Sequence, residues 1–146
     1  MSAIANFEES LLPLEKMRLL LPEAKKVYAQ AEPFPHIYFD DFFSSNVLER
    51  VLKEFPGKND IDWVKYYDGY QKKLANENEK NIGLFSRHLL YSLNSSLFLK
   101  FLEELTGIEC LISDPSFRGG GLHNIFRGGM LGVHADFNKH EQYGFD

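Results

Sequence analysis

The order of helical and strand-like patterns along the chain constrains its fold most. Apolar residues recur three and four positions apart in 13–31, 47–55 and 97–105, which is the period of an amphipathic helix. Shorter strand-like runs, separated by glycine pairs and an Asp-Pro step, fill 108–137. Helices that come first and strands that come last are typical of the α+β class. We therefore expect N-terminal helices to pack on the first strands of a sheet.

Several residues mark where these segments should begin and end. Pro22 is expected to end one helix and to start another, because proline cannot donate a helical hydrogen bond. Small polar residues at 44–46 and 95–96 precede apolar helical runs and predict helix caps there. Gly107 follows the third helical run and is expected to end it in a left-handed conformation.

The remaining segments have weaker patterns. The aromatic and β-branched run 36–43 predicts a short strand, and the aromatic residues of 63–70 indicate another. Residues 71–81 are polar without a clear period, so we expect a surface loop there. The single cysteine, Cys110, lies in an apolar run and is expected to be a buried small hydrophobic residue.

Length and charge limit the class of protein. The 146 residues, 44% of them hydrophobic, are enough for one core. The net charge of -5 and the scattered Lys and Arg argue against a nucleic-acid partner. The first residues lack the basic and apolar pattern of a signal peptide, and no later run has the length of a membrane span. Together with the lone cysteine, these features predict a soluble cytoplasmic protein without membrane association.

The strongest chemical signal is a His-x-Asp pair near the C-terminus. On a strand, alternate side chains share a face, so His134 and Asp136 are expected to point the same way. An imidazole and a carboxylate at this spacing are the adjacent part of a facial triad for Fe(II). The opposite face is apolar and suited to packing under the helices; it carries Leu131, Val133, Ala135 and Phe137.

Four segments in the same order and spacing strengthen this interpretation. They are FPHIYFDDF at 34–42, FLEELTGI at 101–108, DPSFRGGGLH at 114–123 and GGMLGVHADFN at 128–138. From about Pro33 to Asn138 the chain resembles the prolyl-4-hydroxylase-like branch of the 2-oxoglutarate- and Fe(II)-dependent oxygenases. The last two segments are the most specific part of the resemblance.

The resemblance implies a double-stranded β-helix, or jelly roll, with iron at its mouth. It implies that His134 and Asp136 are two of three iron ligands, that 2-oxoglutarate and O₂ are co-substrates, and that ascorbate supports the reaction. The substrate would be a protein or a small molecule. Residues 1–32 would form an N-terminal helical segment, and 33–146 would form the N-terminal part of the oxygenase domain.

The family pattern continues beyond what this sequence contains. Members carry a distal histidine on a later strand, followed by an Arg or Lys that binds 2-oxoglutarate, and no such pair follows Asp136 within the chain. We therefore expect an incomplete jelly roll and no catalysis by this chain alone. The alternative is a non-catalytic, oxygenase-like binding module that associates with another chain through an open sheet edge.

The other histidines are weaker candidates for the third ligand. His140 lies in a polar segment and is expected to be a solvated loop residue. His123 is the better substitute, because strand pairing could bring it near His134, but we expect a supporting or packing role. His36 and His88 lack an acidic or histidine neighbour at ligand spacing and are expected to be structural.

The glycines at 119–121 lack the Lys-Ser/Thr ending of a phosphate-binding loop and are expected to form a turn. Arg118 and Arg127 lie beside glycine turns and are expected to be solvated.

Overall fold

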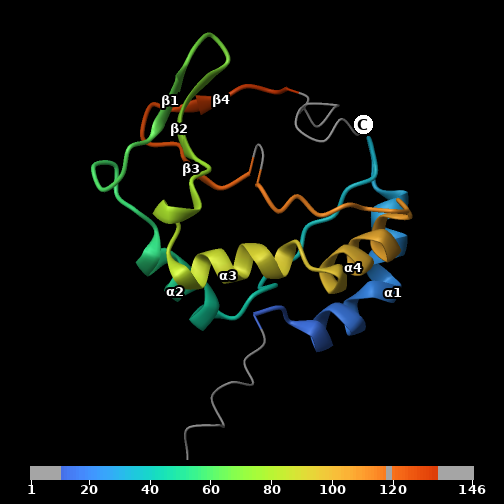
Figure 1. The fold of residues 1–146 in the computed structure, drawn as a ribbon. Helices are drawn as coiled ribbons and strands as arrows, with labels where there is room; N and C mark the ends of the chain where they lie inside the picture. Colours follow the sequence, from blue (N-terminus) through green and yellow to red (C-terminus); the bar gives the residue numbers. More distant parts are fainter. Residues whose placement is uncertain (1–10, 118–119, 135–146) are drawn as a thin grey trace, which may run out of the picture.

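A computed structural model describes residues 11–117 and 120–134 of the chain. Four α-helices and a short 3-10 helix accompany a small antiparallel sheet, so the α+β expectation is confirmed at that level (Figure 1). The elements are α1 Leu14–Gln30, α2 Ser45–Glu54, β1 Val64–Tyr67, β2 Gln71–Asn76, η2 Glu79–Asn81, α3 Leu84–Leu93, α4 Ser96–Thr106, β3 Leu122–Asn124 and β4 Met130–Leu131. The patterns described above did not indicate α3.

Helix α1 runs without a break, so the expectation that Pro22 divides it is wrong. Proline inside a helix removes one hydrogen bond and costs about 3 kcal/mol. Met17 and Ala24, on either side of Pro22, are both buried in the core formed with α4. Burial on both sides of the proline offsets its cost, because breaking the helix would remove one of these residues from the core.

The main core lies between α1 and α4 and is completed by an aromatic segment. Phe101 of α4 has ring centroids of Phe39 and Phe42 at 6.2 and 6.3 Å. Residues 36–43, expected to form a strand, are in turn or irregular conformation instead. Phe39, Phe42 and Phe43 pack against the core between α1 and α4, whereas Tyr38 is 79% exposed.

The predicted caps are confirmed. Ser44 accepts a hydrogen bond from the Val47 amide, and Ser95 accepts one from the Phe98 amide, each at 3.4 Å. Gly107 ends α4 with a φ of 76°, a left-handed conformation that glycine adopts without strain. Each of these signals depends only on neighbouring residues.

Strands β1 and β2 form a hairpin, with Val64 opposite Ala75 and Tyr67 opposite Lys72. The strand expected in 63–70 is therefore confirmed, whereas the surface loop expected in 71–81 is wrong for β2. Strand β2 is the centre of the sheet, because β1 pairs with one of its edges while β3 and β4 pair with the other. Its residue Leu74 is only 1% exposed, and the burial of this side chain helps to stabilise a strand whose sequence is largely polar.

Strands β3 and β4 lie in line along one edge of β2. His123 is opposite Ala75 and Leu131 is opposite Gln71. The step from His123 to Leu131 is eight positions, whereas the step between their partners on β2 is four. The surplus forms the bulge at 125–129. Strand β2 leads through η2 into α3, so the helices lie near its C-terminal end and β4 lies at the far end, beside the hairpin turn (Figure 1).

Cys110 is exposed, so the expectation that it is buried is wrong. Its φ of 61° places it in a turn after α4 instead of in a strand, and the turn directs the apolar run Ile108–Ile112 away from the core. In the part of the chain that the structure describes, no helix combines the length and apolar character needed to cross a membrane.

Candidate metal centre

His134 lies just past β4, beside the turn of the β1–β2 hairpin. The amide of Gly132 donates to the Tyr70 carbonyl over 2.7 Å and holds the extended chain against that turn. The His134 side chain is exposed, and its Nδ1 lies 2.8 Å from the carbonyl oxygen of Gly132. Asp136, the other expected ligand, lies outside the described residues, as does His140.

The apolar side chains beside His134 do not pack under the helices. Leu131 is 44% exposed and Val133 is fully exposed, so that expectation is wrong for both residues. The physical reason is the register: Leu131 pairs with Gln71, at the end of β2 that lies farthest from the helices. Among the described elements the principal contacts join helix to helix or strand to strand, so the expectation that the N-terminal helices pack on these strands is wrong in this part of the chain.

His123 is held by its own contacts. Its Nδ1 is 3.3 Å from the Lys73 ammonium, which can only donate, so Nδ1 is the acceptor. Its Nε2 then carries the proton and donates to the Gly120 carbonyl at 3.2 Å. Neither ring nitrogen has the available lone pair that a metal ligand needs.

The register also separates His123 from His134. Their nearest paired positions on β2, Ala75 and Gln71, are four residues or about 13 Å apart, and His134 follows three residues after Leu131. Nitrogen ligands of one ion lie about 3 to 4 Å from each other, because each bond is about 2.1 Å long. His123 therefore does not complete a site with His134 in this arrangement.

The other histidines have local contacts. Nδ1 of His36 lies 2.8 Å from the Phe34 carbonyl, and the His88 ring lies 6.5 Å from that of Tyr91. Within 11–117 and 120–134, no three His, Cys, Asp or Glu side chains are grouped closely enough to hold a metal ion. Arg127 is exposed as expected, and Arg118 lies outside the described residues.

Two glycines permit close approach of the backbone to β2. Gly121 has a φ of 86°, and a Cβ there would lie 2.5 Å from the Asn76 carbonyl oxygen. A Cβ on Gly129 would lie 2.7 Å from the carbonyl oxygen of Lys72. These glycines let the chain run against β2, and the expected turn role of the glycine segment is confirmed at Gly121.

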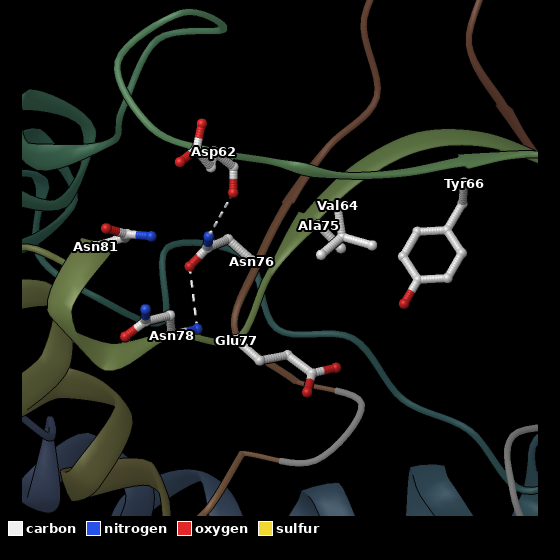
Figure 2. Close-up of a pocket in the computed structure, with 8 residues that line it drawn as sticks. All are labelled: Asp62, Val64, Tyr66, Ala75, Asn76, Glu77, Asn78 and Asn81. Carbon is white, nitrogen blue, oxygen red and sulfur yellow. Dashed lines mark hydrogen bonds between the residues drawn. The ribbon is translucent and has the colours of Figure 1, made fainter.

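A hollow beside the sheet was not indicated by sequence patterns. It lies where β1 begins and β2 ends and has a volume of about 490 Å³; Figure 2 shows its lining residues. Asn76 is only 4% exposed; it donates to the Asp62 carbonyl at 3.3 Å and accepts from the Asn78 amide at 3.1 Å. The lining residues are Asp62, Val64, Tyr66, Ala75, Asn76, Glu77, Asn78 and Asn81. No local signal could have found this hollow, because it depends on the pairing of β1 with β2.

Comparison of the chain with protein-family models, with curated proteins and with solved structures finds no match.

Proposed function

We propose that the chain is the N-terminal part of an Fe(II)- and 2-oxoglutarate-dependent oxygenase of the prolyl-4-hydroxylase-like kind. In this proposal, the sheet provides the first strands of a double-stranded β-helix, and His134 and Asp136 are two of the three iron ligands. The support is the GGGLH and GGMLGVHADFN pair of segments, together with the α+β architecture.

The observation that carries the proposal is the GGMLGVHADFN segment, and the orientation of His134 agrees with it. Its Nδ1 lies 2.8 Å from the Gly132 carbonyl, which can only accept, so Nδ1 carries the proton. In a neutral imidazole this leaves the lone pair on Nε2, the form in which histidine binds a metal, and a backbone carbonyl on the other nitrogen is the usual support of such a ligand.

Bound iron would supply the oxidising chemistry with O₂ and 2-oxoglutarate, with ascorbate keeping it reduced. The protein would hold the ion through His134 and Asp136 and orient the imidazole through the Gly132 carbonyl. Because the proposal assigns only two of the three iron ligands to this chain, we expect it to bind iron weakly and to show no turnover by itself.

Anaerobic titration with Fe(II), followed by calorimetry, tests the proposal. His134→Ala and Asp136→Ala should each weaken binding by about tenfold or more, whereas His36→Ala should leave it unchanged. His36 is a matched control, because it is also exposed and its Nδ1 also contacts the carbonyl two residues earlier. Equal affinity in all four proteins would refute the metal site.

A coupled assay of 2-oxoglutarate decarboxylation, with Fe(II) and ascorbate, tests the catalytic part. We expect succinate formation at background level for residues 1–146, and activity only when a longer chain supplies a further histidine. In that longer chain, Asp136→Ala should abolish Fe(II)-dependent succinate formation. Turnover by the variant close to wild type would contradict the assignment.

The second candidate is a non-catalytic binding module. The observation that favours it is the outer edge of β1, which pairs with no other strand among the described residues. Binding of a partner chain by a protein that fails the iron titration would support this candidate.

A further inference from the structure

The outer edge of β1 presents backbone groups for pairing. The Asp68 amide donates to the Gln71 carbonyl at 3.0 Å and closes the hairpin. Because backbone groups alternate in direction along a strand, Val64 and Tyr66 direct theirs toward β2. Lys65 and Tyr67 therefore direct their N–H and C=O groups outward, where no described strand pairs with them.

The hollow of Figure 2 lies on one face of this same edge strand. Val64 and Ala75 are opposite each other and form an apolar floor. The Tyr66 hydroxyl and the Glu77 carboxylate extend from the two sides of that floor toward the same space (Figure 2). A side chain from a strand added to β1 would lie beside Val64 and Tyr66, because neighbouring strands share faces.

The charged side chains that line the hollow are negative. The carboxylates of Asp62 and Glu77 are exposed, and neither has an ion pair or hydrogen bond with any described residue. Lys73 is on the same face and does not line the hollow; its ammonium donates to His123 at 3.3 Å and lies 5.5 Å from the Tyr66 ring centroid. The Glu77 carboxylate extends into the hollow, which therefore favours a cation.

We propose that β1 binds an extended peptide strand and that a Lys or Arg side chain of this peptide enters the hollow beside Glu77 and Tyr66. Backbone pairing with Lys65 and Tyr67 provides the affinity, and the Glu77 carboxylate selects the basic side chain. The hollow lies at the opposite end of β2 from His134, so this binding does not depend on iron.

The experiment uses the metal-free chain and a fluorescent heptapeptide of alternating valine and threonine with a central arginine. Two matched peptides carry glutamate in place of arginine, or N-methyl groups on alternate backbone amides. Anisotropy should show that the arginine peptide binds at least tenfold tighter than the N-methylated one, because two backbone hydrogen bonds are lost. The glutamate peptide should bind more weakly than the arginine peptide, and the difference should shrink at high salt.

Variants of the protein locate the contact. Glu77→Gln should weaken the arginine peptide about threefold, while Glu49→Gln, which removes an exposed charge on α2, should change nothing. Lys65→Pro removes an outward amide and should weaken binding about fivefold relative to Lys65→Ala, which keeps it. Should Lys65→Pro unfold the hairpin, the N-methylated peptide tests the same hydrogen bonds on the unaltered protein.

Three results would overturn the proposal: no binding of the arginine peptide, equal binding of the N-methylated peptide, or preference for the glutamate peptide. Failure of the iron titration would leave all three readouts unaffected, so the two proposals stand or fall separately.

Discussion

Replacement of Glu54 should destabilise the protein by separating α2 from α3. Glu54 is the last residue of α2, and its carboxylate accepts hydrogen bonds from the Phe85 amide at 3.2 Å, the Ser86 amide at 2.8 Å and the Ser86 hydroxyl at 2.9 Å. The N-cap residue of α3, Gly83, has no side chain to do this. Glu54 therefore caps α3 from another helix.

The size of the effect follows from these three contacts. Loss of a helix cap costs about 0.5 to 2 kcal/mol, and hydrogen bonds to a charged group contribute about 1.5 to 3 kcal/mol. Because Glu54 is only partly buried, water would satisfy some of the released donors, and we expect about 2 kcal/mol for Glu54→Ala. For a chain of 146 residues this lowers the melting temperature by about 6 °C. Glu54→Gln keeps an acceptor oxygen and should cost about half as much.

The effect should depend on pH. Partial burial raises the pKa of Glu54, but the hydrogen bonds from Ser86 and Phe85 and the charge of Arg50 together outweigh it, so the pKa lies below its ordinary value of 4.5. A lowered carboxyl pKa contributes stability above the unfolded-state pKa, and this stability is lost as the pH falls through the folded-state value. The difference between wild type and Glu54→Gln should thus be full at pH 7 and shrink below about pH 4.5.

Urea unfolding at pH 7 and at pH 4 measures both effects. Glu49→Ala is the matched control, because Glu49 is an exposed residue of the same helix. A free energy of unfolding for Glu54→Ala within about 0.5 kcal/mol of that control would refute the capping role. A difference between wild type and Glu54→Gln that stays constant with pH would refute the electrostatic part.

Three further predictions concern the core, a helix end and the cysteine. Leu74→Ala should lower the free energy of unfolding by about 2 to 5 kcal/mol, because Leu74 is 1% exposed. Leu52→Ala, at a 75% exposed position, should lower it by less than about 1 kcal/mol, and urea titration measures both values. Gly107→Ala should lower the free energy of unfolding by about 1 kcal/mol in thermal unfolding, because the φ of Gly107 is 76°. Gly69→Ala, at an open position with no positive φ, should lower it less, and equal losses of stability would contradict the left-handed cap. Cys110 should react with a thiol reagent in the native protein at a rate close to that in denaturant, and strong protection would contradict its exposed position.

Local patterns alone determined α2, α4 and their ends. The caps at Ser44, Ser95 and Gly107 were predictable because each hydrogen bond or backbone conformation involves residues at most four positions apart. The glycine segments near His134 were likewise identified as turns, and extended chain around Leu131 was expected from its sequence. The identification of His134 as a ligand remains a prediction from the motif.

The tertiary structure decided the features that depend on distant residues. The polar sequence of β2 predicts a loop, whereas β1 and β3 stabilise it as a strand through backbone hydrogen bonds that its own composition does not indicate. The contact between Lys73 and His123 joins residues 50 positions apart and fixes which imidazole nitrogen carries the proton. The Glu54 carboxylate likewise caps α3 by accepting a hydrogen bond from the Phe85 amide, 31 positions away in the sequence. Such residues become neighbours only when the chain is folded, so periodicity within a short window of sequence cannot reveal their contacts.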